Sequence, residues 1–297
     1  MTAGTIFQDT RTPLTVWFAA VWYMASAKNG VSAGTLYRLL GFGYYQTAWA
    51  MLHRYCTAMV RPGRDRLSGD VEADETMIGG VKPGKRSRGA KGKVLVEIAV
   101  EQTQPKGFGR CRIQVIASAK RGPLGQFIND NVEPGPVVLT DGLKSYGKAV
   151  GPNYTHKPIN IAASGLPAHV VLPGVHRVAA LVKRWLLGTH QGSVESDHVQ
   201  AYLNEFCFRF NRRNSRSRGL LFRRLLEQGV EVGPVTYRSM VVRPAHKKVK
   251  PTPPATHRVG PPTLVLALPS RPWRLPMTQP SGPLGRSGDG SGADGDA

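Results

Sequence analysis

The sequence predicts an α/β protein in which a helical region comes first, a mixed strand-and-helix region follows, and further helices close the fold. Two observations carry this prediction. Apolar residues recur at helical spacing up to about residue 60, whereas from residue 70 onward they alternate with polar residues or form short runs rich in Val and Ile. The resulting order, helices and then strands with interspersed helices, is typical of a sheet covered by helices.

The N-terminal helices are predicted from caps and spacing. Thr12 is expected to cap a helix that has Pro13 at its first position and a buried face formed by Leu14, Trp17, Phe18, Val21 and Trp22. A second helix begins after the cap Ser32, and a third spans residues 45–59 beyond a Gly-Phe-Gly turn at 41–43. This pattern fits a helix-turn-helix and an ordinary helical hairpin equally well.

The sheet region begins at Asp70, where Val71 and Ala73 alternate with acids. The segments that follow are expected to form strands 94–100 and 111–117, helix 124–131, strand 136–140 and helix 143–150. Three successive strands favour an antiparallel meander, so the order is β-β-β-α-β-α. After a weak pattern at 161–173, helices are expected at 175–187 and 193–209.

The charge of the chain is strongly positive. Its 297 residues include 40 Lys and Arg against 19 Asp and Glu, a formal net charge of +21. This excess points to a polyanionic partner, with nucleic acid as the leading candidate. The three cysteines form no C-x-x-C pair, which excludes a disulfide scaffold and a cysteine-built zinc site and favours the cytoplasm.

The longest apolar stretch, Leu14 to Ala27, has 14 residues, fewer than the roughly 20 that cross a bilayer. We therefore expect no membrane partner. Ala25-Ser26-Ala27 imitates a signal-peptide cleavage site, but Asp9 beside Arg11 does not make the basic region that a signal peptide needs.

Acids stand out in so basic a chain, and three of them, Glu72, Asp74 and Glu75, share the first strand. Asp74 is expected to point away from the apolar face of that strand. Asp141 closes the strand 137–140, and strand ends in α/β sheets are where ligands and metals gather. Carboxylates on neighbouring strands could share two divalent cations about 4 Å apart, which suits phosphodiester cleavage. The alternative for either acid alone is a solvated residue at a strand end.

Several strings of residues occur in a consistent order along the chain: TAGTIF at 2–7, VEADET at 71–76 with IGG at 78–80, RGAKGK at 88–93, TDG at 140–142 and FCFRFNRR at 206–213. Over residues 2–240 they resemble the insertion-sequence transposases with an ISXO2-like domain. The resemblance implies an RNase H-like core of the DDE superfamily, which cuts DNA at the element's ends and joins the freed 3′ ends to a target. With the helical pattern of the first part of the chain and the Pro/Gly-rich composition of its end, this predicts a helical DNA-binding region (1–68), an RNase H-like catalytic domain (69–240) and a disordered tail (241–297).

The resemblance also implies the site residues. Asp74 and Asp141 match the two metal-binding aspartates, and His176 stands where many relatives have Glu or Asn. Lys183 follows seven residues later, close to two helical turns, so it shares a face with His176. Asp74, Asp141 and His176 are thus the expected ligands of two Mg²⁺ or Mn²⁺ ions, and Lys183 completes the catalytic set. An amphipathic helix with one polar stripe is the alternative for His176.

Two departures from the family pattern are evident. Relatives usually carry a cysteine-paired zinc ribbon ahead of the TAGT string, whereas this sequence begins with that string, so we expect the zinc ribbon to be missing. Met77 also replaces an aromatic residue beside Asp74.

Basic residues free of neighbouring acids are the expected DNA contacts. They are Lys82, Lys85, Arg86, Arg88, Lys91 and Lys93 in a glycine-spaced stretch, Lys183 and Arg184 on the helix, and Arg209, Arg212 and Arg213 in a second cluster that continues through Arg216, Arg218, Arg223 and Arg224. The alternative for both clusters is solvated basic surface.

The sequence therefore predicts a metal-dependent transposase that binds double-stranded DNA as a homo-oligomer and associates with the nucleoid. A non-catalytic DNA-binding protein, with 45–59 as its recognition helix, or an inactive transposase remnant is the main alternative. A third reading is another RNase H-like nuclease, such as a junction resolvase, which would cut without joining.

Overall fold

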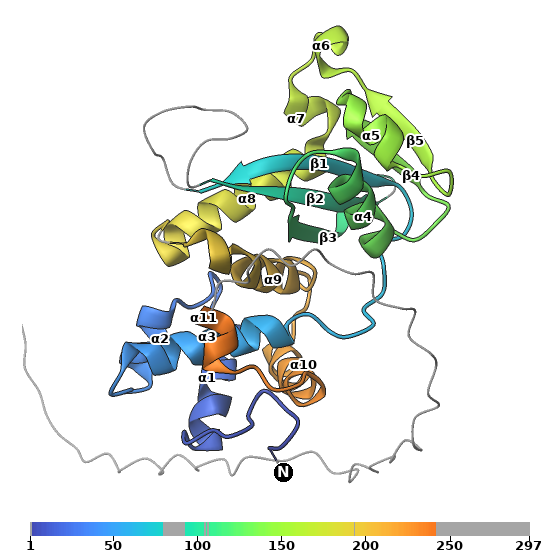
Figure 1. Ribbon diagram of the computed structural model, residues 1–297. Coiled ribbons are helices and arrows are strands. Elements are labelled where there is room, and N and C mark those ends of the chain that lie inside the picture. The colour runs from blue at the N-terminus through green and yellow to red at the C-terminus, as the bar shows by residue number, and fades with distance from the viewer. Residues whose placement is uncertain (1, 80–92, 104, 106, 193, 242–297) are drawn as a thin grey trace, which may run out of the picture. The chain divides into compact units, whose positions relative to one another are not determined.

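A five-stranded mixed sheet forms the centre of the computed structural model, which describes residues 2–79, 93–103, 105, 107–192 and 194–241 (Figure 1). Its strands are β1 (Val71–Ile78), β2 (Val94–Gln102), β3 (Phe108–Val115), β4 (Val137–Asp141) and β5 (Thr155–Ile159). The order across the sheet is β3-β2-β1-β4-β5. The first three strands form the predicted antiparallel meander, and β4 and β5 are added in parallel to β1. This is an RNase H-like sheet, so the predicted fold class is confirmed.

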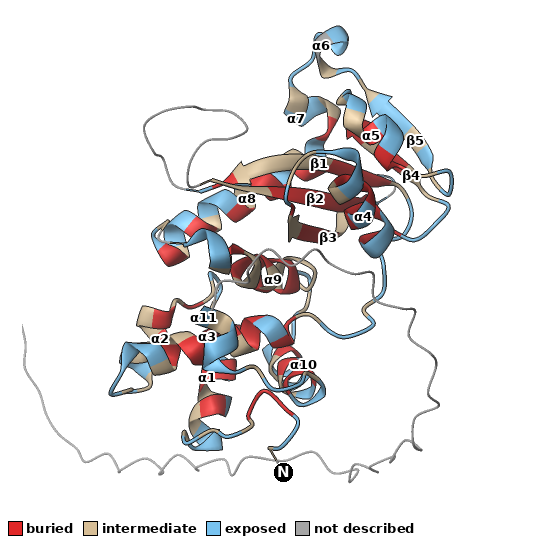
Figure 2. Cartoon of the chain, viewed as in Figure 1, coloured by how far each residue is buried: buried red, intermediate tan, exposed pale blue. Residues whose placement is uncertain are grey.

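Helices cover both faces of this sheet (Figures 1 and 2). One face carries α8 (Pro173–His190) and α9 (Val199–Phe210), and the other carries α4 (Arg121–Asn131) and α5 (Lys144–Ala149). Because side chains alternate along a strand, β1 directs Val71 and Ala73 toward α4 and α5 and directs its even-numbered acids toward α8.

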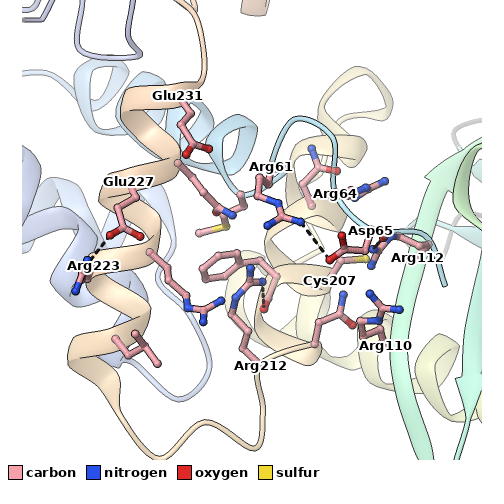
Figure 3. A pocket seen from close by; sticks show the side chains of 17 residues that line it. Arg61, Arg64, Asp65, Arg110, Arg112, Cys207, Arg212, Arg223, Glu227 and Glu231 are labelled. Carbon is pink, nitrogen blue, oxygen red and sulfur yellow. Dashed lines mark hydrogen bonds and ion pairs between the residues drawn. The ribbon is translucent and has the colours of Figure 1, made fainter. Parts of the chain in front are cut away.

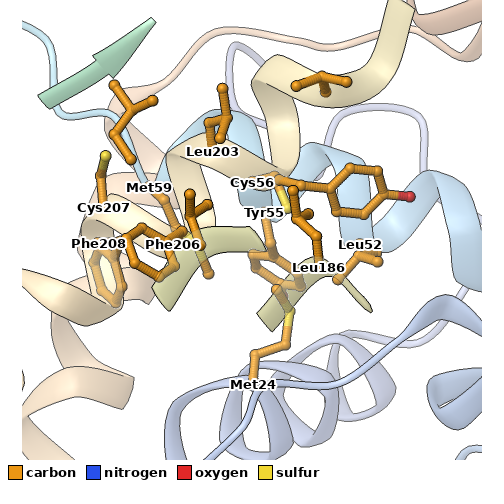
Figure 4. Close-up of a cluster of buried hydrophobic side chains, with 14 of the residues drawn as sticks. Met24, Leu52, Tyr55, Cys56, Met59, Leu186, Leu203, Phe206, Cys207 and Phe208 are labelled. Atoms are coloured by element: carbon orange, nitrogen blue, oxygen red, sulfur yellow. The ribbon is translucent and has the colours of Figure 1, made fainter. Parts of the chain in front are cut away.

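The N-terminal helices α1 (Leu14–Ser26), α2 (Ala33–Leu39) and α3 (Tyr45–Ala58) pack with two later helices, α10 (Arg218–Glu231) and α11 (Tyr237–Val241). Trp17 meets Phe7 and Tyr55 edge to face, with ring centroids 5.2 and 5.3 Å apart. The same apolar cluster continues through α8 and α9 to the sheet (Figure 4). The helices thus share one core with the sheet, and the predicted division at 68/69 stays a prediction.

Two N-terminal details differ from the prediction. Pro13 takes the cap position of α1 and Thr12 does not cap it. The hydroxyl of Thr10 organises this turn instead, because it accepts hydrogen bonds from the Thr12 amide and the Trp17 indole. In addition, Leu14, Phe18 and Trp22 of the expected buried face are exposed. Ser32, by contrast, caps α2 as predicted and accepts from the Thr35 amide at 3.1 Å.

Several elements were not predicted. They are β5, the short helices α6 (Ile161–Ser164) and α7 (Ala168–Val171), α10 and α11. The helix predicted at 193–209 begins later than expected, because Ser196–His198 form a 3₁₀ turn and α9 starts at Val199. Strand β5 lacks alternation and contains Pro158, which an edge strand tolerates because one side of its backbone is unpaired. Of the predicted disordered tail, 241–297, Val241 is the last residue of α11, and residues 242–297 lie outside the described residues. Within the described part of the chain, no helix has the length and apolarity needed to cross a membrane.

Candidate active site

Three carboxylates converge where β1 and β4 part. Asp74, Glu75 and Asp141 each place one oxygen within 4.8 Å of the others, and all three are half-buried. Pairing between the two strands ends at Ala73 and Thr140, so Asp141 follows the last paired residue. The Asp141 carboxylate also accepts a hydrogen bond from the Leu143 amide at 3.1 Å, which fixes its orientation.

Glu75 is the member of this acid cluster that sequence reasoning did not include. Alternation along a strand places Glu75 on the opposite face from Asp74. Beyond Ala73, however, β1 has no paired neighbour on the β4 side, so side chains from both faces can turn toward that open edge. The position of Glu75 depends on where pairing between β1 and β4 ends, and that point cannot be read from the sequence.

The two predicted residues on α8 lie beside this acid cluster. His176 Nε2 lies 3.9 Å from Asp74 Oδ2, and Lys183 Nζ donates a 2.7 Å hydrogen bond to Thr76 Oγ1. Asp74, His176 and Lys183 line one cavity of about 290 Å³ between β1 and α8. Ala179 and Ala180 lie between the two α8 residues and leave room there, because their side chains are small.

The electrostatics of His176 suit a neutral ligand. Burial lowers the pKa of His176, against the opposing influence of Glu72, and so favours the neutral form of the ring. Its Nε2 atom is buried and has no hydrogen-bond partner among the described residues. Burial likewise lowers the pKa of Lys183, while the nearby Asp74 carboxylate raises it.

A further carboxyl group, Glu97 on β2, is fully buried and lies opposite Glu75 in the strand register. Burial raises the pKa of Glu97 to about 9, and the charges of Glu75 and Asp74 act in the same direction. Glu97 is therefore neutral at pH 7 and adds no negative charge to the acid cluster.

Glu72 fixes the position of α8 relative to β1. Its Oε2 accepts a 2.9 Å hydrogen bond from the amide of Val175 in the first turn of α8, which has no side-chain cap of its own. Its Oε1 accepts from Gln102 Nε2 at 2.7 Å. Gly174 permits this approach, since a Cβ atom there would lie 2.9 Å from Glu72 Oε2. Glu72 thus sets where His176 lies.

The predicted DNA contacts are spread widely. Lys82, Lys85, Arg86, Arg88 and Lys91 lie outside the described residues, Lys93 is half-buried just before β2, and Arg184 is exposed on α8 beside Lys183.

The arginines of the second cluster do not join the acid cluster. Arg209 is largely buried and donates to the carbonyl oxygens of Met24, Ala27 and Lys28. Arg213 donates to the carbonyl oxygens of Phe108, Gly109 and Phe210. Arg209 and Arg213 therefore tie chain segments together, whereas Arg212 lies over the ring of Phe208, with Cζ 4.0 Å from the centroid. A role in DNA binding stays a prediction for all three.

Comparison with known proteins identifies the central part of the chain. Residues 66–211 match the family model of the ISXO2-like transposase domain. This span contains the whole sheet and all four residues predicted to be catalytic.

Among solved structures, the chain is similar to the Mos1 transposase paired-end complex with left transposon end, at 11% identity over 75% of this chain and 82% of that chain, with a TM-score of 0.24. A similarity this low carries no structural argument, so the fold assignment rests on the strand order. No curated protein matches the chain.

Proposed function

We propose that this chain, whose residues 66–211 form an ISXO2-like transposase domain, cuts DNA at the ends of an insertion sequence and joins the freed 3′ ends to target DNA. The observation that carries the proposal is the acid cluster of Asp74, Glu75 and Asp141 beside the cavity that holds His176 and Lys183.

The donor set fits divalent Mg²⁺ or Mn²⁺. Hard cations prefer carboxylate oxygens at about 2.1 Å, so oxygens on opposite sides of one ion lie about 4.2 Å apart. The 4.8 Å spread of the acid cluster is close to that spacing, and small side-chain rotations would close the difference. Asp74 and Asp141 would hold the ions, Glu75 offers a further oxygen, and His176 offers a neutral nitrogen. Bound ions of this kind activate a water or a 3′-hydroxyl and stabilise the leaving oxygen in phosphodiester chemistry.

Lys183 is positioned to bind the substrate. Its ammonium group lies in the same cavity as Asp74 and is held by Thr76 Oγ1. A phosphate placed next to the acid cluster would meet this positive charge, which offsets the repulsion between the DNA backbone and the carboxylates. We therefore assign Lys183 to phosphate binding and the acids to the ions.

A DNA-binding protein without chemistry is less well supported. That reading uses α3 as a recognition helix, but eight of its fourteen residues are buried among the other helices. Only its first turn, with Tyr45 and Gln46, is exposed over consecutive residues. Three converging carboxylates would also repel DNA phosphates, which a protein that only binds DNA would not require.

The test is strand cleavage of a labelled duplex that carries the inverted repeats flanking the coding region. We expect nicking and strand transfer with Mg²⁺ or Mn²⁺ and neither reaction in EDTA. Asp74→Asn and Asp141→Asn should each lower cleavage by orders of magnitude and leave DNA binding intact, because each keeps the side-chain shape but removes a charged ligand.

The matched control is Asp130→Asn, the same change at an exposed position of α4, which should cleave normally. Normal cleavage by either active-site variant would reject the assignment. Cleavage without joining would favour a nuclease of the resolvase type.

A further inference from the structure

Figure 3 shows the residues that line a second, larger cavity, which has a volume of about 620 Å³. It is bounded by the segment before β1, the edge strand β3, the end of α9, and α10, and it shares no lining residue with the cavity between β1 and α8. Its most frequent lining residue is arginine, contributed by all four segments: Arg61 and Arg64, Arg110 and Arg112, Arg212, and Arg223 and Arg224. We call it the arginine cavity.

The acids of this region neutralise only part of the charge. Arg61 pairs with Asp65 at 3.2 Å and Arg223 with Glu227 at 2.7 Å. Arg110 pairs with Glu101 at 2.6 Å. A fourth acid, Glu231, also lines the cavity. Among the described residues, however, neither Glu231 nor any other acidic side chain lies within ion-pair distance of the remaining four arginines. An unneutralised set of guanidinium groups in one concave site attracts an anion.

Two of these arginines, Arg112 and the half-buried Arg212, each have one buried donor atom without a partner among the residues that the structure describes. Arg112 is 5% exposed, and its Nη atoms donate to the carbonyl oxygens of Cys111 and Asp65. Its Nε atom is buried without a hydrogen-bond partner in the described part of the chain, and so is Nε of Arg212. Leaving buried donors unpaired costs free energy, and both donors belong to guanidinium groups that line the cavity.

The guanidinium groups also repel one another. Burial lowers the pKa of Arg212 to about 10, and Arg224, Arg61 and Arg112 act in the same direction. Burial and then Arg64 lower the pKa of Arg112. Charges that destabilise each other in this way are relieved together by one negative ligand.

We propose that the arginine cavity is a phosphate-binding site that holds the sugar-phosphate backbone of a DNA strand away from the acid cluster. Arginine forks bind phosphate oxygens in pairs, and four segments present such forks to one space. The volume lies within the range of small-molecule sites, about 300–1,000 Å³, and therefore suits a short piece of backbone better than a whole duplex. The affinity for phosphate is inferred from the cavity itself. The inference that the phosphate belongs to DNA rests on the proposed function.

The test uses a fluorescein-labelled 20-base-pair duplex of arbitrary sequence, in EDTA, with binding followed by anisotropy at several salt concentrations. The variant Arg212→Gln/Arg224→Gln removes two charges from the cavity. If each contacts a phosphate, the slope of log affinity against log salt should become shallower by about two, since each contact contributes about 0.9. The control Lys120→Gln/Arg121→Gln removes the same charge from exposed residues outside the cavity and should leave the slope nearly unchanged.

Two further arms make the result decisive. Arg212→Lys/Arg224→Lys keeps both charges and should retain the steep slope, and all variants should share the parent's unfolding temperature by circular dichroism. Inorganic pyrophosphate should compete with the duplex for the parent protein and much less for the glutamine variant. An unchanged slope in the glutamine variant overturns the proposal. The proposal is also overturned if the glutamine variant loses pyrophosphate binding but keeps duplex binding unchanged, because the cavity would then be a site for free phosphate.

Because the binding assay is run in EDTA, its outcome does not depend on metal binding by the acid cluster. Failure of the cleavage test would in turn leave the affinity for phosphate untouched.

Discussion

Glu97 lies only one strand away from the acid cluster, but its surroundings differ from those of the cluster. Asp74 and Glu75 are half-buried, whereas Glu97 is fully buried behind them and its pKa rises from 4.5 to about 9. The folded state therefore binds a proton that the unfolded state releases above about pH 4.5. That contribution to stability is fully present below this pH and is lost as pH rises through about 9.

Replacing Glu97 by Gln should remove this pH dependence. In EDTA, the free energy of unfolding of the parent should fall between pH 5 and pH 9, by at most about 1.4 kcal/mol per pH unit from this group. The variant should show a flatter profile and exceed the parent in stability at pH 9. Urea unfolding at several pH values measures this, and parallel profiles would mean that Glu97 is ionised in the folded state.

His176 makes a prediction about metal preference. Imidazole supplies a nitrogen ligand without charge, which Mn²⁺ accepts more readily than Mg²⁺. We expect more cleavage with Mn²⁺ than with Mg²⁺, a smaller difference in His176→Glu, and lower activity with either ion in His176→Ala. If His176→Ala cleaves as well as the parent with both ions, Glu75 is the better candidate for the third ligand.

The sequence predicted part of this site. Asp74 and Asp141 could be placed near one another because both lie on strands with readable patterns, and the helical spacing of His176 and Lys183 placed them on one face. Glu75 and Glu97 could not be found in this way, because their positions depend on where strand pairing ends and on the β1–β2 register.

At the scale of elements, the attachment of α8 to β1 decides whether the site is assembled. Glu72→Ala should lower the free energy of unfolding by about 1–3 kcal/mol, because the Val175 amide loses its buried acceptor. Glu72→Gln keeps an acceptor for that amide and should cost less. Urea denaturation compares the two, and equal losses would mean that the carboxylate charge, rather than the hydrogen bond, holds the helix.

The elements that the sequence did not predict were missed for different reasons. The polar strand β5 owes its place to backbone pairing with β4. Helix α10 does carry a readable cap, since Ser217 accepts from the Leu220 amide at 3.2 Å, and it buries Leu221 and Leu225. The arginines in this segment obscure the helical spacing of its apolar residues. A strand such as β5, in contrast, has no local signal that could be read.

For the whole molecule, the charge of +21 divides into structural and available parts. Composition correctly indicated an excess of positive charge, but it could not distinguish structural arginines from exposed ones. Arg209 donates hydrogen bonds to backbone carbonyl groups and lies 3.9 Å from buried Glu205, whereas Arg184 is exposed. Arg209→Ala should cost about 3–5 kcal/mol in unfolding free energy, because it leaves Glu205 buried without its partner. Arg184→Ala should stay within about 0.5 kcal/mol. Similar losses by chemical denaturation would contradict this division.

The central claim is that the acids at the parting of β1 and β4 hold divalent cations. The most direct measurement is anomalous diffraction from crystals of the protein grown with Mn²⁺. We predict an anomalous peak within coordination distance of carboxylate oxygens of both Asp74 and Asp141, and its loss in crystals of Asp141→Asn. A Mn²⁺ peak bound elsewhere in well-ordered crystals, with these two aspartates making no metal contact, would contradict the account.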